Sequence, residues 1–381
     1  MRRGKDAAMQ AGFRRDVGAS AAPDQLARAV RAANPLAGSG GVLLTTGRVS
    51  RQLFGAGVLD AALSLPGVSD VLVNGPGVVW VDRGDGLQES GVRVESEPEL
   101  RALAHRLVAA AGRRLDDACP FADARMADGT RVHVVLPPIA AQGTTISLRV
   151  PPARTFSLDD LVATGGLAPA GRDLLRRLVA ARVSFVVTGG TGTGKTTVLS
   201  TLLSEVDPRH RVLLVEDSAE LRPRHPHVVR LEARPANAEG AGAVTLADLV
   251  RQALRMRPDR LVVGEVRGPE VTDLLSALNT GHDGGCATVH ANRPQDVPAR
   301  FEALGVAAGL SRATTHAQLV AGLQSVVHLR RDPGGRRVVD SVSVVEAEGG
   351  LAQVRVGMWL APGQCRPGPA AQALAELVGA A

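Results

Sequence analysis

The chain has 381 residues, 45% of them hydrophobic and 22% charged, which is a globular composition with length for two or three domains and excludes a collagen-like or wholly disordered chain. Aromatic residues are scarce, with six Phe, two Trp and no Tyr, which argues against a protein that stacks single-stranded nucleic acid on aromatic rings. The formal net charge of +6 suits anionic ligands such as nucleotides without requiring DNA or an anionic membrane.

Residues 1–45 mix Arg, Ala, Gly and Asp without a sustained period, and we expect a flexible leader there. The basic start is followed by no apolar signal-peptide core, and no stretch reaches the roughly 20 apolar residues that a membrane helix needs. Three cysteines without C-x-x-C spacing support neither a disulfide framework nor a zinc site. We therefore expect a cytoplasmic protein that reaches the membrane only through partners.

Residues 46–150 are predicted to form a small N-terminal α/β domain. The β-like runs VSDVLVNG, GVVWVDRG, RVHVVLPP and TTISLRV are interrupted by one helical pattern, PELRALAHRLVAAAGRRL. Two prolines after Val150 mark a break, and residues 151–165 are predicted to be a linker with a small helix.

Residues 166–381 are predicted to form a second domain, built on a parallel sheet that is covered on both faces. Its apolar runs VSFVVTGG, RVLLVED, RLVVGEV and CATVHA alternate with helical segments, as in doubly wound α/β folds. Thr245 and Asp248 have the spacing of a capping box at the start of one of these helices.

A phosphate-binding loop follows the first of these strands. The segment fits the pattern G-x-x-x-x-G-K-[ST], with an apolar strand before it and a helix after it. Its backbone N–H groups and the helix N-terminus would bind phosphates, Lys195 would reach the β- and γ-oxygens, and Thr196 would bind Mg²⁺. The alternative is a glycine-rich turn with a chance lysine. The predicted nucleotide-binding residues are Gly189, Gly190, Thr191, Gly192, Thr193, Gly194, Lys195, Thr196 and Thr197.

Carboxylates end two of the predicted strands, at the edge where ligands bind in such sheets. RVLLVED ends in Glu216 and Asp217, with Glu220 nearby, and RLVVGEV carries Glu265. Hydrolysis of a phosphoanhydride needs one acid to position Mg²⁺ or its waters and another to orient the attacking water. The alternative is that either acid caps a helix or pairs with an arginine.

Two histidines lie in NTGHDGGCATVHANRP, eight residues apart. The spacing between His282 and His290 and the lack of a third soft ligand disfavour zinc. A histidine at the strand edge that senses the γ-phosphate is the functional interpretation of His290, and a structural histidine is the alternative.

Four segments in order resemble the Walker A, Asp box, Walker B and His box of the type II/type IV secretion ATPases. They are residues 189–197, VEDSAEL, RMRPDRLVVGEVRG and NTGHDGGCATVHAN. The stretches DVLVNGPGVVWVDRG, GRRLDDACPFADARMADGTRVHVVLPP and ISLRV are similar to the Tad/Flp pilus branch, which includes an actinobacterial subfamily of Tad-like, conjugal-transfer-associated ATPases. The resemblance covers roughly residues 55–345.

The resemblance implies an α/β protein with a RecA-like P-loop NTPase motor domain after a smaller, PAS-like N-terminal domain. It implies a homo-hexamer that uses ATP and Mg²⁺, works beneath a polytopic inner-membrane platform protein, and drives assembly of a Tad/Flp-type pilus or protein secretion. Direct nucleic-acid binding is not expected. The cargo, and the choice between extension and retraction, stay open.

The resemblance also assigns roles to single residues. Glu216 takes the position of the catalytic glutamate, Glu265 that of the Walker B acid near the metal, and His290 that of the second His-box histidine. Family members also place N-domain arginines against the phosphates, and the matching stretches hold Arg125, Arg131 and Arg149.

Which of these arginines acts stays open, with Arg149 the first choice for a cation that reaches ATP when the domains close. Val150 stands where many relatives have a lysine, which weakens the case for a second cation there. The alternative for each arginine is pairing with a nearby carboxylate.

Two rival functions remain at this stage. The basic composition, with a pI near 10.3, is compatible with a RecA-like nucleic-acid motor, although stacking aromatics are missing. A nucleotide-gated scaffold that binds ATP without turnover is the other. The occupied acidic and basic positions favour the secretion ATPase.

Overall fold

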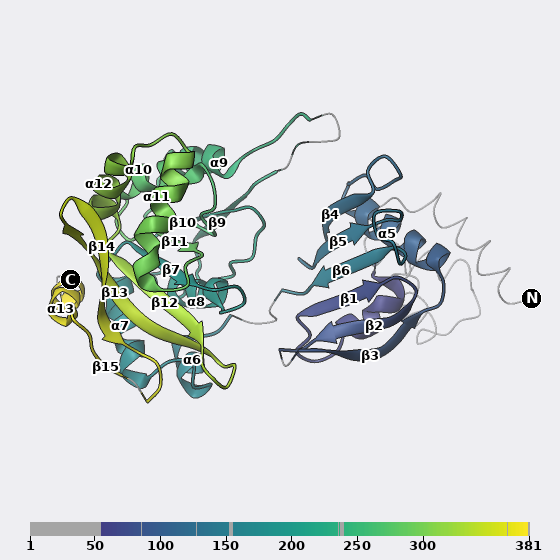
Figure 1. Cartoon of the computed structure of the whole chain (residues 1–381), viewed down its shortest axis with the longest axis horizontal. Coiled ribbons are helices and arrows are strands. Elements are labelled where there is room, and N and C mark those ends of the chain that lie inside the picture. The colour runs from purple at the N-terminus through teal and green to yellow at the C-terminus, as the bar shows by residue number, and fades with distance from the viewer. Residues whose placement is uncertain are drawn as a thin grey trace, which may run out of the picture. The chain divides into compact units, whose positions relative to one another are not determined.

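The computed structural model describes residues 55–84, 86–126, 128–151, 155–234, 236, 240–363 and 365–379 (Figure 1). The chain divides into two compact units, an N-terminal unit with described residues up to 151 and a C-terminal unit with described residues from 155 onward. The predicted leader lies outside the described residues.

The N-terminal unit is a six-stranded antiparallel sheet with helices on one face. Its elements are η1 (Gly57–Leu59), α4 (Asp60–Leu63), β1 (Asp70–Asn74), β2 (Gly77–Asp82), β3 (Leu87–Val94), α5 (Glu97–Ala110), β4 (Phe121–Arg125), β5 (Arg131–Val135) and β6 (Thr145–Arg149). The strand order is β3-β2-β1-β6-β5-β4. The core lies between α5 and the sheet face that carries Val71, Val134 and Leu148.

All four predicted strands and the predicted helix of this unit are present. The sequence analysis missed β3 and β4, the two edge strands. Each pairs on one side only and carries a largely exposed, polar sequence, LQESGVRV in β3 and FADAR in β4. Because little of either strand is buried, its apolar alternation is too weak to be recognised from sequence.

The C-terminal unit contains a nine-stranded mixed sheet. Its elements are α6 (Leu158–Ala163), α7 (Pro169–Ala180), β7 (Phe185–Gly189), α8 (Lys195–Leu203), β8 (Val212–Glu216), β9 (Val228–Glu232), α9 (Leu246–Leu254), β10 (Arg260–Val263), α10 (Glu270–Leu278), β11 (Cys286–Val289), η2 (Pro294–Asp296), α11 (Val297–Ala307), α12 (Arg312–Gly322), β12 (Ser325–Arg331), β13 (Arg337–Glu348), β14 (Leu351–Trp359), β15 (Arg366–Pro367) and α13 (Ala371–Gly379).

The sheet order is β15-β14-β13-β12-β7-β11-β10-β8-β9. The strands from β12 to β9 in this order are parallel, and β13, β14 and β15 extend the sheet in antiparallel fashion. The predicted parallel strands are therefore confirmed. The C-terminal antiparallel strands were not predicted.

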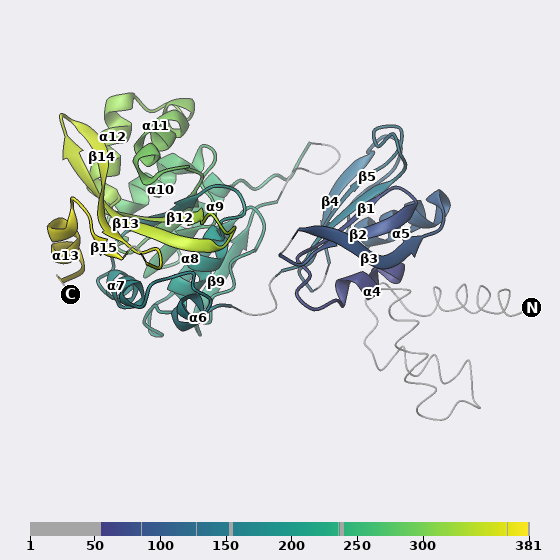
Figure 2. The same cartoon turned by 60° about the horizontal axis from the view of Figure 1, so that its bottom comes forward.

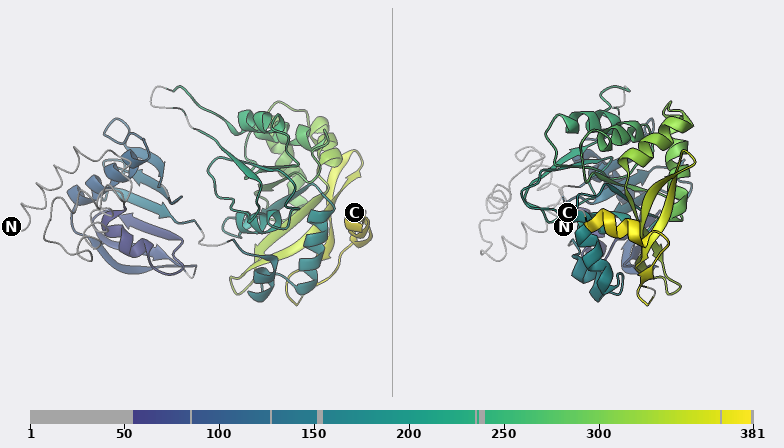
Figure 3. Two further views of the ribbon diagram at one scale, coloured as in Figure 1. Left: turned by 180° about the vertical axis from the view of Figure 1, so that it is seen from behind. Right: turned by 90° about the vertical axis from the view of Figure 1, so that its left-hand side faces the viewer.

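Helices cover both faces of this sheet (Figure 2). A hydrophobic core lies between the sheet and the helices on each face. Alternate residues of a strand enter opposite cores, as Val187 and Val186 of β7 do. One core packs against α6, α7, α8 and α13, and the other against α9, α10, α11 and α12. Figure 3 shows α13 beside β14, where Leu374 packs closely against Gly357.

The predicted capping box at the start of α9 is confirmed. The hydroxyl of Thr245 accepts from the N–H of Asp248, and the Asp248 carboxylate accepts in return from the N–H of Thr245. None of the helices in the described ranges combines the length and apolar character required to cross a bilayer.

Candidate nucleotide site

The phosphate-binding loop leaves the sheet at the carboxyl end of β7, whose five residues are all buried. Gly192 has φ 70° and Gly194 φ 95°, a left-handed backbone region that side chains rarely adopt. A Cβ atom at Gly189 would lie 2.6 Å from the carbonyl oxygen of Leu329 and 2.7 Å from Oγ1 of Thr193. Glycine is therefore required for the close packing and the sharp path of this loop.

Lys195 is the first residue of α8, and its ammonium group folds back over the loop. Nζ donates to the carbonyl oxygens of Gly189 at 3.1 Å and Gly190 at 3.0 Å. Burial lowers the pKa of the Lys195 ammonium from its ordinary value, and the negative charge of Glu265 opposes this effect. The ammonium group lies over the loop, in a position from which it can turn toward phosphate oxygens. Thr196 and Thr197 follow it in the first turn of α8, both half-buried.

Glu216 ends β8, and only 3% of it is exposed. Its Oε1 accepts from the N–H groups of Glu220 and Leu221, each at 2.9 Å. Its Oε2 is buried and has no hydrogen-bond partner among the described residues. Burial raises the pKa of the Glu216 carboxyl to about 7. The side chain therefore holds the turn after β8 with one oxygen and keeps the other free, at a pKa suited to a general base.

Glu265 lies two residues after β10 and forms two polar contacts. Its Oε1 lies 2.9 Å from Nε2 of His290, and its Oε2 accepts from Nη2 of Arg267 at 2.6 Å. Burial and the charge of Lys195 lower the pKa of His290, and Glu265 opposes this. A neutral His290 can donate Nε2–H to Glu265, so the two residues form one hydrogen-bonded unit next to Lys195.

His290 follows β11, which pairs with β7 on one side and β10 on the other. The strand order therefore brings His290 and Glu265 together beside the loop. His282, by contrast, precedes β11 and contacts the carbonyl oxygen of Ala277 at the end of α10. The described residues contain no cluster of His, Cys, Asp or Glu that could hold a metal by itself.

Mg²⁺ fits this site only in part. The Thr196 hydroxyl has the position in α8 from which a P-loop threonine binds the ion. Both carboxylate oxygens of Glu265, however, already have partners in Arg267 and His290. Each of these oxygens still has a free lone pair, so an ion could reach Glu265 beside these partners, directly or through a bound water.

The N-terminal unit gathers its three candidate arginines into one row. Arg125 lies opposite Arg131, Arg131 opposite Arg149, and Arg149 opposite Asp70 across four adjacent strands. Directly opposite residues point to the same face of a sheet, here the face away from the core that holds Leu148. Nε of Arg149 donates to Oδ1 of Asp70 at 3.0 Å, and Nε of Arg125 donates to the Gly129 carbonyl at 3.4 Å.

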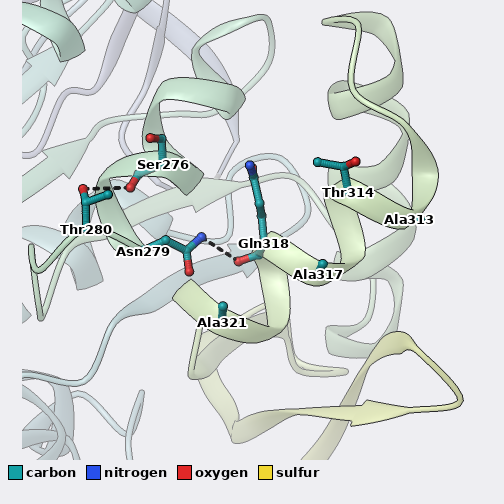
Figure 4. Close-up of a pocket in the computed structure, with 8 residues that line it drawn as sticks. All are labelled: Ser276, Asn279, Thr280, Ala313, Thr314, Ala317, Gln318 and Ala321. Atoms are coloured by element: carbon teal, nitrogen blue, oxygen red, sulfur yellow. Dashed lines mark hydrogen bonds between the residues drawn. The ribbon is translucent and has the colours of Figure 1, made fainter.

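A surface hollow of about 540 Å³ lies between α10 and α12, away from the residues above (Figure 4). Its lining mixes alanines with Ser, Thr, Asn and Gln side chains, and the amide of Asn279 donates to the carbonyl oxygen of Gln318 at 3.1 Å. None of its lining residues was a predicted site residue. The hollow therefore adds nothing to the nucleotide site.

Sequence reasoning did not single out Arg267, which contacts Glu265 and lies 3.7 Å from Asp217. The available signal was its place two residues after Glu265, at the same sheet edge. Arg331 and Arg337, which contact the loop from the C-terminal hairpin, were also missed. No local motif marks them, because strand pairing alone brings them to the loop.

Comparison with known proteins agrees with the fold and motifs. Residues 56–353 match the family model "Type II/IV secretion system protein". A "putative conjugal transfer protein" of Mycobacterium tuberculosis is 54% identical over 312 residues, covering 80% of this chain and 89% of that protein. The conjugal transfer protein TrbB of Rhizobium radiobacter is 30% identical over 293 residues, covering 75% and 86%.

Two solved structures show the same fold. The pilus retraction motor PilT, solved with bound ADP, has a TM-score of 0.56 at 22% identity and covers 76% of this chain and 82% of its own. The ATPase DotB of Legionella pneumophila has a TM-score of 0.52 at 21% identity, covering 74% and 77%. The RecA-like α/β fold is thereby confirmed, and the chain belongs to the type II/IV secretion system protein family.

Proposed function

We propose that this protein is an ATP hydrolase that powers a type II/IV-related secretion, conjugation or pilus apparatus. One observation carries the proposal: the phosphate-binding loop with Lys195 lies at the same sheet edge as Glu216, Glu265 and His290. Family membership and the ATPase and motor relatives support it.

In this proposal the loop and Lys195 bind the phosphates of ATP. Lys195 exchanges its two carbonyl contacts for phosphate oxygens, which are stronger acceptors because they are charged. Thr196 and Glu265 are the residues that would hold Mg²⁺, which would neutralise phosphate charge when bound.

Glu216 is the proposed general base. Its free oxygen Oε2 accepts the proton of the attacking water, while Oε1 stays fixed by two backbone N–H groups and holds the carboxylate in place. The Glu265–His290 pair is the proposed sensor of the γ-phosphate, because it lies next to Lys195 and is coupled to it electrostatically.

The finer parts of the proposal concern assembly. We propose a cytoplasmic homo-hexamer that acts on a polytopic inner-membrane platform protein of a Tad/Flp-type pilus or protein secretion apparatus, with no direct binding of nucleic acid. We further propose that the arginine row, with Arg149 foremost, supplies a cation to the γ-phosphate. The two-domain boundaries, 46–150 and 166–381 with a linker at 151–165, are part of the same proposal.

Chemical labelling tests the nucleotide site directly, because the chain has only two lysines, Lys5 and Lys195. An acyl-phosphate derivative of ATP transfers its acyl group to an amine beside the bound phosphates. We expect mass spectrometry to find the label on Lys195 and to find it removed by excess ATP or ADP. Label on Lys5 alone, or label on Lys195 that excess ATP leaves unchanged, would refute the site.

Turnover separates the proposal from its rivals. Mg²⁺-dependent phosphate release from ATP supports the hydrolase. Competitive labelling of Lys195 without phosphate release, even with the platform's cytoplasmic domain present, would instead indicate a nucleotide-gated scaffold. Salt-dependent DNA binding that stimulates turnover would indicate a nucleic-acid motor.

A further inference from the structure

The hairpin formed by β12 and β13 lies against the phosphate-binding loop. β12 runs parallel to β7, and the last pair in their register is Leu329 with Gly189. β12 continues to Arg331 while the chain after β7 turns into the loop. Arg331 lies opposite Arg337 on β13, so both side chains emerge together at the end of the hairpin.

Both arginines bind the same atom of the loop. Nη2 of Arg331 donates to the carbonyl oxygen of Gly192 at 3.1 Å, and Nε of Arg337 donates to it at 3.0 Å. A Cβ atom on Gly192 would lie 3.4 Å from Nη2 of Arg331, and one on Gly194 would lie 3.6 Å from Cδ of Arg337. The two guanidinium groups thus cover one side of the loop.

The hairpin turn holds Arg331 in place. Nη1 of Arg331 donates to the carbonyl oxygen of Gly335 at 2.9 Å. The turn is closed by the N–H of Asp332, which donates to the carbonyl oxygen of Arg336 at 2.8 Å, and by the Asp332 carboxylate, which accepts from the N–H of Arg336 at 2.9 Å. These hydrogen bonds therefore fix the Arg331 side chain on an ordered turn next to the loop.

The charges of the pair are not neutralised by carboxylates within the described part of the chain. Their neighbours Arg330 and Arg336 do have such partners, Asp340 at 2.6 Å and Asp332 at 3.1 Å. Like charges directly opposite each other on paired strands are destabilising. The placement of Arg331 and Arg337 beside the phosphate-binding loop, in spite of this repulsion, indicates that they act in phosphate binding.

The geometry of the peptide unit defines that role. A trans peptide is planar, so its C=O and its N–H point to opposite sides. With the Gly192 carbonyl held toward the arginines, the Thr193 N–H points to the other side of the loop. Glycine at position 192 makes rotation of this peptide easy in the absence of such a contact. A loop held in the binding conformation loses less entropy when the ligand arrives.

We propose that Arg331 and Arg337 are positioning residues of the nucleotide site, which fix the Gly192–Thr193 peptide so that the Thr193 N–H faces the phosphates. The proposal rests on the proposed nucleotide function and extends it to the C-terminal hairpin. It makes the outer strands part of the nucleotide site.

The test compares Arg331→Ala, Arg337→Ala and the double variant with Arg336→Ala, a matched control in the same turn whose pairing is with Asp332. We expect each single variant to weaken ADP binding roughly three- to tenfold, less than the full value of a charge-assisted hydrogen bond because the arginines contact the loop and not the ligand. The double variant should weaken ADP binding more. The ADP affinity of the control Arg336→Ala should stay within about twofold of wild type, because loss of an exposed ion pair has only a small effect. KM for ATP should rise with little change in kcat, because the arginine contacts with Gly192 support phosphate binding equally in the ground state and in the transition state.

Two further measurements separate positioning from charge and from folding. Hydrogen exchange of the segment 190–197 without nucleotide should be faster in the double variant and unchanged in Arg336→Ala. Arg337→Lys, which keeps a donor, should recover part of the lost ADP affinity.

Three results would overturn the proposal. Wild-type ADP affinity in the double variant would do so while leaving the nucleotide site intact. An equal loss in Arg336→Ala would show that only the hairpin fold matters. A loss that vanishes at about 0.5 M salt would show attraction at a distance instead of a hydrogen bond. A wild-type protein that binds no ADP would refute the proposed function itself.

Discussion

Replacing Glu216 by Gln separates the stability cost of this residue from its role in turnover. In the folded protein the Glu216 carboxyl has a pKa of about 7, against an ordinary value of 4.5, because the group is buried. At about 1.4 kcal/mol per pH unit, this difference amounts to about 3 kcal/mol in favour of the neutral form. The native state binds this proton more tightly than the unfolded state does. Stability is therefore fully present below pH 4.5 and is lost as the pH rises through about 7.

The uncharged amide introduced by Glu216→Gln removes this pH-dependent loss. The amide oxygen, at the position of Oε1, can still accept from the N–H groups of Glu220 and Leu221. The amide N–H group, at the position of Oε2, lacks a partner, which lowers the free energy of unfolding by about 1–3 kcal/mol at every pH. We therefore expect the stability of Glu216→Gln relative to wild type to rise by roughly 2–3 kcal/mol between pH 5 and pH 9.

Urea unfolding without nucleotide measures this difference. A Trp80→Phe background leaves Trp359 of β14 as the sole tryptophan, so fluorescence reports on the C-terminal unit. The same variant should bind ATP with near wild-type affinity and release no phosphate. A stability difference that stays constant with pH would refute the burial argument, and normal turnover would refute the general-base role.

Further predictions concern the other site residues. Lys195→Ala should lower phosphate release at least about 100-fold with an unchanged circular dichroism spectrum, because it removes the charge on the β/γ-phosphates, and wild-type turnover would contradict the assignment. His290→Ala should reduce kcat roughly tenfold while leaving ADP affinity unchanged, since only the γ-phosphate is sensed, and an equal loss of ADP affinity would indicate a structural histidine. Arg149→Ala should lower turnover far more than ATP affinity. Asp70→Asn breaks the ion pair between Asp70 and Arg149 but keeps the arginine, so it should change the free energy of unfolding by at most about 1 kcal/mol and leave turnover intact. Light scattering of the purified protein should give the mass of a hexamer, and a monomer at full activity would contradict the ring.

The sequence predicted the parts of the site that are local in the chain. The phosphate-binding loop, Glu216, Glu265 and His290 each lie at or just after the end of a short apolar strand, and parallel strands bring their carboxyl ends to one edge. The strand runs also predicted the parallel part of the large sheet, because residues buried on both faces form uninterrupted apolar segments.

Features that depend on pairing between distant segments escaped prediction. The contact of Arg331 and Arg337 with Gly192 follows from the pairing of β12 with β7, about 140 residues apart in the chain. The free oxygen of Glu216 and the two partners of Glu265 depend on side-chain packing, which a motif does not contain. The ion pairing that the sequence left open as an alternative is present for Glu265, which pairs with Arg267. Glu216 instead accepts from the backbone N–H groups of Glu220 and Leu221, which lie in no helix.

The most direct test of the account is the rate of phosphate release from Mg²⁺-ATP by the full chain, measured beside Lys195→Ala and Glu216→Gln. The account predicts slow turnover by wild type, acceleration by the cytoplasmic domain of a platform protein, and no turnover by either variant. ATP binding at Lys195 without any phosphate release, or release that persists in both variants, would contradict it.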